Sequence, residues 1–309
     1  MRIVFFGSGV FAIPSFEALL AASHEVLALV TQPDKEQGRG RALASPPLKP
    51  VAEAHAVSVL QPRRVREAEA IEVLRALRPE IQVVVAYGQI LPRAVLELAP
   101  RGAVNVHASL LPLYRGAAPI QRAIAAGETQ TGVTTMLLDE GLDTGPLLLA
   151  RPAPIGPEET AAELQERLAH LGAALLVETL QGLASGGILP RAQDHTQATH
   201  APLLKKEEGR IDWLSPARLI HQRVRGFAPW PGAFTTWHGL WLKILRAQLR
   251  PDATGEAGTL REIAGDALVV CCGDGTCLGL LEVQLEGRRR VSGAAFAAGA
   301  RLEPGARFA

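Results

Sequence analysis

The chain has 309 residues, of which 48% are hydrophobic and 20% are charged, with a formal net charge of +1 at pH 7. These values are typical of an ordinary globular protein that is long enough for two domains. Residues 1–9 lack the apolar core and cleavage site of a signal peptide, and no apolar run approaches the roughly 20 residues of a membrane helix. We therefore expect a cytoplasmic protein without membrane contact.

The charge is unevenly divided along the chain. Residues 1–190 carry 16 Lys and Arg against 19 Asp and Glu, whereas residues 191–309 carry 16 against 12. A basic C-terminal part beside an acidic N-terminal part indicates an anionic macromolecular partner. A few unpaired arginines on a solvated face would give the same balance.

The chain begins with a predicted strand over 2–6, followed by the turn Gly7-Ser8-Gly9 and a helix from Ala12. This spacing fits a dinucleotide-binding turn, in which glycines let the backbone approach a pyrophosphate at a helix N-terminus. It also fits the first turn of an α/β sheet that binds another ligand. Asp34 stands where a ribose ligand is expected, but it opens a long Pro- and Gly-rich loop, which is a poor place for a fixed contact.

Strands and helices alternate through the N-terminal part. The near-continuous apolar strands indicate a parallel sheet covered by helices on both faces, which would bind its ligand at the carboxyl ends of the strands. A long helix over 157–184 follows. The predicted strands are 2–6, 26–31, 81–86, 103–107 and 132–138, and the helices between them are 12–22, 49–56, 67–77, 92–98 and 119–126.

Residues 33–50 are too long and irregular for an ordinary connection between a strand and a helix. Two glycines make the segment flexible and three prolines stiffen its far end. Its charge is +2, because Lys35, Arg39, Arg41 and Lys49 outnumber Asp34 and Glu36. From the residues alone, a surface loop is the simplest interpretation.

Three polar residues follow two of the apolar strands. Asn105 and His107 lie two apart, so their side chains point to the same side, and Asp143 lies in a loop between Gly141 and Gly145. We expect adjacent strands to bring Asp143 towards the pair, where its carboxylate would favour the protonated imidazole. Together the three can orient a carbonyl, stabilise an oxyanion and move a proton. A hydrogen-bonded core histidine remains the alternative for His107.

The chain changes character after the long helix. Residues 191–200 read as a linker, and residues from about 205 onward show short strands with turns, including 288–296. The three cysteines, Cys271, Cys272 and Cys277, fall in one strand-like stretch and read as buried thiols rather than as a metal site. We expect a Rossmann-like α/β parallel-sheet domain over 1–189, a linker over 190–206, and a smaller OB-like β-barrel domain over 207–309.

At this point the sequence resembles the folate-dependent formyltransferase family. Residues 105–112 and 114–121 carry the runs NVHASLLP and YRGAAPIQ, and residues 142–145 carry the second signature, LDTG. The resemblance extends over nearly the whole chain, including FFGSGVFA, QPDKEQGRGRAL, RIDW and RVRGFAPWPGAF. It favours the view that Gly7-Ser8-Gly9 is the first turn of a sheet reused for a folate rather than an NAD site.

The resemblance implies a reaction and its residues. The donor would be 10-formyltetrahydrofolate as co-substrate, without a metal, and the acceptor the α-amino group of initiator methionyl-tRNA. Asn105, His107 and Asp143 correspond to the catalytic residues of the family. The folate-binding residues would be Ser109, Leu110, Leu111, Pro112, Tyr87, Gly88, Gln89, Ile90 and Leu91.

The resemblance also implies tRNA contacts by basic residues. The 33–50 segment would enter the acceptor stem, with Arg39 reaching a base edge or an unpaired end and Arg41 and Lys49 holding phosphates. The C-terminal domain would bind phosphates. The candidate contacts are Lys35, Arg39, Arg41, Lys49, Lys205 and Lys206, with further positive charge from Arg210, Arg223, Arg225 and Arg288–Arg290.

Alternatives remain at this stage. An enzyme that formylates a small amine, such as glycinamide ribonucleotide or an amino sugar, or a hydrolase of the folate would not need the C-terminal domain. A non-catalytic tRNA-binding protein would not need Asn105, His107 and Asp143, and an NAD enzyme would rest on the opening glycines alone. We expect a monomer that binds tRNA and folate.

Overall fold

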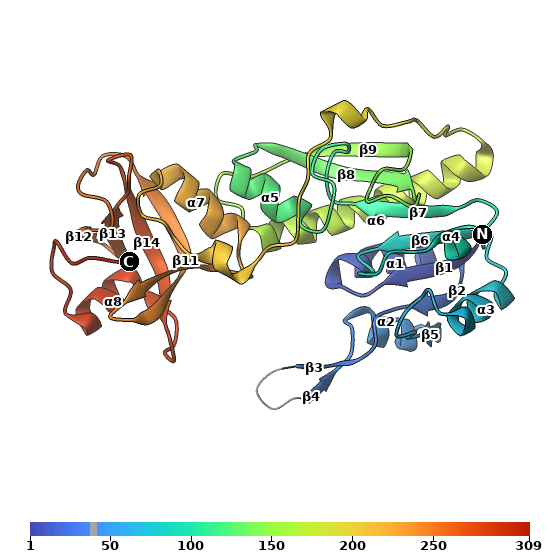
Figure 1. The fold of residues 1–309 in the computed structure, drawn as a ribbon, viewed down its shortest axis with the longest axis horizontal. Helices are drawn as coiled ribbons and strands as arrows, with labels where there is room; N and C mark the ends of the chain where they lie inside the picture. Colours follow the sequence, from blue (N-terminus) through green and yellow to red (C-terminus); the bar gives the residue numbers. More distant parts are fainter. Residues whose placement is uncertain (38–41) are drawn as a thin grey trace. The chain divides into compact units, whose positions relative to one another are not determined.

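The computed structural model describes residues 1–37 and 42–309, and Figure 1 shows how their helices and strands are arranged. The N-terminal part holds a seven-stranded sheet in the order β5-β2-β1-β6-β7-β8-β9. Its central strands are mostly apolar, and Ile3, Phe5 and Phe6 are 0% exposed. The strands are β1 Arg2–Gly7, β2 Glu25–Val30, β5 Ser58–Leu60, β6 Ile81–Val85, β7 Ala103–His107, β8 Gln130–Leu137 and β9 Leu147–Pro154.

The predicted helices of the N-terminal part are all present, with ends shifted by a few residues. α5 has the predicted bounds, and a hairpin of β3 Lys35–Gln37 and β4 Ala42–Ala44, which was not predicted, follows β2. The helices are η1 Val10–Ala12, α1 Ile13–Ala21, α2 Leu48–Ala54, α3 Ala68–Ala76, α4 Arg93–Leu96, α5 Pro119–Ala126 and α6 Ala161–Ser185.

The predicted Rossmann-like parallel sheet is present, and two antiparallel strands at one edge make it mixed. β5, β2, β1, β6 and β7 run parallel, whereas β8 is antiparallel to β7 and β9 is antiparallel to β8. The sequence placed a parallel strand at 132–138 because an apolar strand carries no signal of its direction. It missed β9, whose Pro152 and Pro154 are tolerated because this strand lies at the edge of the sheet.

Helix α6 covers one face of the sheet and thereby defines the other as the face of the site. A Cβ added at Gly172 would lie 2.8 Å from Val106, and Thr179 shares a 2.8 Å hydrogen bond with Thr135 of β8. Val106 and Asn105 point to opposite sides of β7 because side chains alternate along a strand. Asn105 and His107 therefore project from the face opposite α6.

Helix α6 is also long and apolar enough, by length and composition alone, to cross a membrane. The expectation from the sequence that no such run exists missed this helix. Its apolar stripe is accounted for by the core, because Leu164, Leu168 and Leu180 are 0% exposed.

The C-terminal part is an antiparallel sheet in the order β10-β11-β14-β13-β12, with β15 paired to β14. The predicted β-domain is thus present, and its core includes Leu242, Leu268 and Leu280. All three cysteines are free and buried. The strands are β10 Ala233–Trp237, β11 Leu240–Arg250, β12 Leu260–Ala264, β13 Ala267–Cys271, β14 Cys277–Leu285 and β15 Val291–Ser292.

Two helices in this part were not predicted. The extended run expected over 288–296 is wrong beyond β15, because Ser292 caps a helix that starts at Gly293 by accepting a hydrogen bond from the Ala295 N–H at 3.2 Å. The helical elements are η2 His195–Gln197, η3 Lys206–Gly209, α7 Ala217–Gly226 and α8 Gly293–Ala300.

The chain forms two compact units that interleave in sequence. The first comprises Met1–Pro119, Gln130–Pro154 and Gln165–Ala201, and the second Ile120–Thr129, Ile155–Leu164 and Pro202–Ala309. Within the second unit, Arg225 of α7 donates to the carbonyl oxygens of Gly156 and Glu159 at 3.3 and 3.0 Å. Two segments of the N-terminal half therefore pack with the C-terminal sheet, and the domain boundaries expected from the sequence stay a prediction.

Candidate active site

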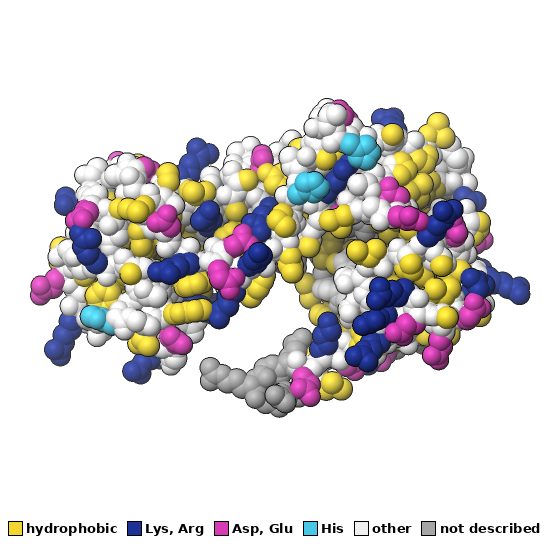
Figure 2. Space-filling model, viewed as in Figure 1, with side chains coloured by type: hydrophobic (Ala, Val, Ile, Leu, Met, Phe, Trp, Pro, Cys, Tyr) yellow, Lys and Arg dark blue, Asp and Glu magenta, His cyan; other side chains and the backbone are white. Residues whose placement is uncertain are grey.

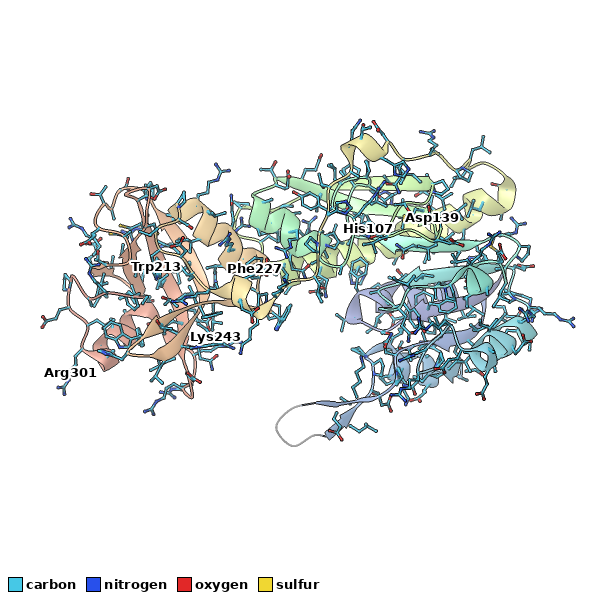
Figure 3. All side chains as sticks on the ribbon, viewed as in Figure 1. His107, Asp139, Trp213, Phe227, Lys243 and Arg301 are labelled. Atoms are coloured by element: carbon cyan, nitrogen blue, oxygen red, sulfur yellow. The ribbon has the colours of Figure 1, made fainter. Side chains whose placement is uncertain are left out.

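Strand β7 presents Asn105 and His107 on the face of the first sheet opposite α6, and Figure 3 labels His107 at the end of this strand. The His107 side chain is buried, and its Nε2 lies 3.0 Å from the carbonyl oxygen of Tyr114. Because a carbonyl oxygen only accepts hydrogen bonds, Nε2 carries a proton in this arrangement. Nδ1 is therefore the ring nitrogen that can change its protonation during a reaction.

Asp143 reaches His107 from the loop between β8 and β9. Its Oδ2 accepts a 2.7 Å hydrogen bond from the Gly116 N–H and lies 3.6 Å from His107 Nδ1. Asp139 shapes this loop by accepting from the Gly141 N–H and the Thr144 hydroxyl at 3.0 and 2.7 Å. The sequence correctly expected Asp143 beside the pair, but for a wrong reason: β8 is antiparallel, so the loop starts at the opposite end of β7 and folds back over the sheet.

Three polar groups at this site have no hydrogen-bond partner among residues 1–37 and 42–309. They are the side-chain amide of the partly exposed Asn105, Nδ1 of His107 and Oδ1 of Asp143. An amide N–H and an imidazole N–H can donate to one carbonyl oxygen, and a carboxylate can take up a proton nearby. The arrangement suits the attack of a nucleophile on a carbonyl carbon, with the negative charge building up on its oxygen.

The loop after β7 is held tightly. Ser109 is 1% exposed and donates to the Leu113 carbonyl oxygen at 2.6 Å, and the Leu111 N–H donates to the Thr134 hydroxyl at 3.1 Å. Leu110 and Pro112 are partly exposed. Residues 109–112 are therefore anchored to the same face of the sheet as His107, since Thr134 is the register partner of His107.

The segment after β6 is divided between the core and solvent. The Tyr87 ring is 2% exposed and packs edge-on against Phe6 at 5.4 Å, so the ring itself belongs to the core. Burial raises the pKa of the Tyr87 phenol to about 12. Gly88 has a φ of +84, and Gln89 Oε1 accepts a hydrogen bond from the Val65 N–H at 3.0 Å. The Ile90 side chain is 80% exposed, whereas Leu91 is buried. Gly88 and Ile90 are exposed to solvent here, and Gln89 is partly exposed.

The opening glycine turn is tied to neighbouring strand ends. A Cβ at Gly7 would lie 3.0 Å from the Val85 carbonyl oxygen, so the close approach of β1 and β6 requires glycine there. The Ser8 hydroxyl donates to the Tyr87 carbonyl oxygen at 3.2 Å and accepts from the Gln32 N–H at 3.1 Å. The polar group of the turn thus joins three strand ends.

The basic residues of the 33–50 segment differ in whether they already form ion pairs within the protein. Lys35 is exposed in β3, whereas the Lys49 ammonium lies 2.9 Å from the Asp34 carboxylate, which also accepts from Gln61 at 2.6 Å. The Gln61 hydrogen bond lowers the pKa of Asp34 most, and the contact with Lys49 lowers it further. Arg39 and Arg41 lie outside the described residues.

In the second unit, Figure 2 shows Lys and Arg side chains interspersed with Asp and Glu. Lys205 is exposed, and Lys206 lies 4.3 Å from the centre of the Trp241 ring, which stacks on Phe234 at 4.5 Å. These aromatic rings, Lys206 and Arg210 line a cavity of about 380 Å³. Arg210 and Arg288–Arg290 are exposed, whereas Arg225 is held by carbonyl oxygens.

The sequence missed two residues that build the site. Asp139 could have been found, because an Asp two residues before a glycine commonly closes a turn with its side chain. Gln193 gave no signal, since it lies in a polar stretch that read as a linker, yet it is 6% exposed and touches the Asp143 loop. In the part of the chain that the structure describes, no three His, Cys, Asp or Glu side chains are grouped to hold a metal ion.

Comparison with known sequences gives two family matches. The family described as formyl transferase matches residues 1–180, and the formyl transferase C-terminal domain matches residues 203–301. A methionyl-tRNA formyltransferase of Solibacter usitatus is 54% identical over 303 residues, which cover 98% of this chain and 96% of the relative. One of Geobacter sulfurreducens is 47% identical over 308 residues, covering 100% and 96%.

Solved structures share the fold at low identity. An N-formyltransferase from Helicobacter canadensis, in complex with folinic acid and dTDP-3-aminofucose, has a TM-score of 0.70 at 19% identity and covers 91% of this chain and 98% of its own. A methionyl-tRNA formyltransferase from Clostridium thermocellum has a TM-score of 0.56 at 16% identity, covering 81% and 94%. With its sheet, its loops and both matched regions, the chain belongs to the formyl transferase family.

Proposed function

We propose that this chain transfers the formyl group of 10-formyltetrahydrofolate to the α-amino group of initiator methionyl-tRNA, giving N-formylmethionyl-tRNA for translation initiation. The observation that carries the proposal is that Asn105 and His107 share one face of β7 and that the Asp143 carboxylate lies 3.6 Å from His107 Nδ1. The acceptor is proposed from full-length relatives that bear the name methionyl-tRNA formyltransferase.

Each of the three residues has a distinct task in this proposal. The bound folate supplies an activated formyl carbon, and the Asn105 amide and the His107 Nδ1–H donate to the formyl oxygen as negative charge builds up on it. The Asp143 carboxylate lies within ion-pair distance of Nδ1 and accepts the proton that the attacking amine loses. It passes this proton to N10 of the folate as the bond between N10 and the formyl carbon breaks and tetrahydrofolate leaves. Positioning and electrostatics are sufficient for such a transfer, which requires neither a metal nor a covalent enzyme intermediate.

The folate would bind along two anchored segments. Residues 109–112 offer backbone and partly exposed side chains beside His107, and residues 87–91 offer Gly88, the exposed Ile90 and backbone groups. The Asn105 amide is partly exposed and has no hydrogen-bond partner among the described residues, so it is available to donate to the formyl oxygen. The Tyr87 hydroxyl is not proposed as a contact, because the ring is buried against Phe6.

The tRNA would be held by basic residues on both units. Arg39 is proposed to reach a base edge or an unpaired end, Arg41 and Lys35 to hold phosphates, and Lys49 to brace the segment through Asp34. In the second unit, the phosphate contacts are proposed to be Lys205, Lys206, Arg210, Arg223 and Arg288–Arg290. We further propose a catalytic domain over 1–189, a linker over 190–206 and a tRNA-binding domain over 207–309, in a cytoplasmic monomer without membrane contact.

A formyl-transfer assay with radiolabelled donor tests the proposal and separates it from the alternatives. The purified chain should label initiator methionyl-tRNA, with little labelling of glycinamide ribonucleotide or amino-sugar nucleotides and little release of formate without an acceptor. Preferred labelling of a small amine would identify a sister activity, and acceptor-independent release a hydrolase. Tight tRNA binding without any transfer would leave a binding protein.

A further inference from the structure

We propose that Gln193 is a positioning residue for the transfer, which holds the Asp143 loop over His107 through an amide whose orientation the buried Arg115 imposes. The inference rests on the proposed function, since its readout is formyl transfer. It concerns a residue from the stretch between α6 and the second unit, outside both motifs of the family.

The Gln193 side chain bridges two loops of the site. Its Nε2 donates to the carbonyl oxygens of Asp143 and Gly145 at 2.9 and 2.7 Å. Its Oε1 accepts from the Arg115 Nε and Nη2 at 3.2 and 2.6 Å. Both protons of the amide nitrogen and the amide oxygen are used, and the side chain is 6% exposed. A buried amide with every hydrogen-bonding position filled has one orientation only.

Arg115 imposes that orientation. A guanidinium only donates, so the Gln193 oxygen must face Arg115 and the NH₂ group must face the two carbonyl oxygens. Arg115 is 4% exposed and has no carboxylate oxygen within 4.0 Å in the described ranges, so the amide oxygen and His195 Nδ1, at 3.2 Å from Nη2, are its side-chain partners. The backbone of Arg115 is also fixed, to Thr199 and Ala201.

The Asp143 backbone needs such a restraint. Its φ is +54, a left-handed conformation that costs a non-glycine residue free energy unless its surroundings hold it. The Gly116 N–H donates to the Asp143 carboxylate. The Gln193 amide donates to the backbone carbonyl oxygens of Asp143 and Gly145. Gly116 holds the Asp143 side chain, and its neighbour Arg115 holds the Asp143 backbone through Gln193. The two restraints on Asp143 therefore come from adjacent residues of the chain. Without the amide, the carboxylate would lose its set distance to His107 Nδ1.

Gln193→Glu is the sharpest test, because it keeps the size of the side chain and adds a carboxylate partner for the buried Arg115. The glutamate can still accept from Arg115 but cannot donate to either carbonyl oxygen. We expect the kcat of formyl transfer to fall roughly 10- to 100-fold, with KM for folate and tRNA within about threefold of the parent chain. The melting temperature of the Gln193→Glu chain should stay close to that of the parent chain, so the loss of kcat would not reflect unfolding. Gln197→Glu, an exposed change on the same stretch, should leave kcat unchanged.

A double-mutant cycle with Asp143→Asn decides whether Gln193 acts through Asp143. If it does, adding Gln193→Glu to Asp143→Asn should lower kcat by no more than about twofold further. A second full loss, an effect on KM alone, or a parental kcat in a folded Gln193→Glu chain would overturn the proposal. Should Gln193→Glu not fold, Gln193→Met, which removes the donors with similar volume, is subject to the same outcomes. An inactive parent chain would instead refute the proposed function.

Discussion

His107 Nδ1 and Asp143 Oδ2 lie 3.6 Å apart, within ion-pair distance but beyond the length of a hydrogen bond. The other ring nitrogen, Nε2, is bound to the Tyr114 carbonyl oxygen, and Oδ2 is bound to the Gly116 N–H. Each residue is thus held by one polar atom and keeps another, Nδ1 or Oδ1, without a hydrogen bond among the described residues. A site of this kind is fixed in place yet ready for a substrate.

The first prediction concerns His107. Replacing it by alanine should lower kcat by about two orders of magnitude or more, because the donor to the developing oxyanion is lost. KM for the folate should change little. Steady-state formylation of initiator methionyl-tRNA measures both. His170→Ala, an exposed change on α6, serves as the control and should retain full activity. Near-normal turnover in a folded His107→Ala chain would remove His107 from the reaction.

The second prediction concerns the charge of Asp143. Asp143→Asn keeps the shape of the side chain and still allows one oxygen to accept from the Gly116 N–H. It removes the proton acceptor, so we expect a loss of kcat of roughly 10²- to 10⁴-fold with little change in folate affinity, measured by calorimetry. Asp252→Asn in an exposed turn is the control. Weakened folate binding with a normal kcat would assign Asp143 to binding instead.

The third prediction is a dependence of stability on pH at Tyr87. Burial raises the pKa of its phenol from 10.0 to about 12, so between these values the unfolded chain loses a proton that the folded chain retains. Stability is then complete below about pH 10 and falls by roughly 2 to 3 kcal/mol as the pH rises to 12. Tyr87→Phe should abolish this part of the loss, as urea unfolding from pH 8 to 12 would measure.

Two other properties of the protein affect how the stability of the Tyr87→Phe chain should be interpreted. The thiol pKa values of Cys272 and Cys277 are also raised to about 12 by burial, so some alkaline loss should persist in the variant. Among the described residues the Tyr87 hydroxyl is buried and has no hydrogen-bond partner, so at pH 8 the variant should be at least as stable as the parent chain. Equal pH dependence of the two chains would contradict the prediction, and weaker folate binding would show that the hydroxyl contacts the ligand.

The fourth prediction concerns phosphate contacts in the second unit. Replacing Arg288, Arg289 and Arg290 by alanine should weaken tRNA binding and lower the slope of log Kd against log salt by about 0.9 for each arginine that contacts a phosphate. Removing the same charge at Arg63, Arg64 and Arg66, which are exposed in the first unit, should have a smaller effect. Filter binding at several salt concentrations measures both slopes.

Arg225 provides the contrast within the same unit. Its guanidinium is held by the carbonyl oxygens of Gly156 and Glu159, and its Nε is buried with no hydrogen-bond partner in the part of the chain that the structure describes. Arg225→Ala should therefore lower the melting temperature and leave the salt slope unchanged. A slope that falls for Arg225→Ala but not for the triple variant would place the tRNA on another face of this unit.

The sequence by itself determined the local elements and the pairing of two site residues. The bounds of β7 and α5 follow from an apolar run and from the proline that starts the helix. The shared direction of Asn105 and His107 follows from the alternation of side chains along any strand. These features depend on neighbours in the chain, which is why they could be predicted without the fold.

Only the tertiary structure decided the direction of β8, the existence of β9 and the part played by Gln193. The direction of a strand depends on which edge its connection reaches, and a buried apolar strand carries no mark of that choice. Asp143 meets His107 because its loop folds back over the sheet, and Gln193 meets that loop across a separate stretch of chain. A glutamine in a polar segment becomes a positioning group only when folding buries it between a guanidinium and two carbonyl oxygens, and that environment does not exist in the sequence alone.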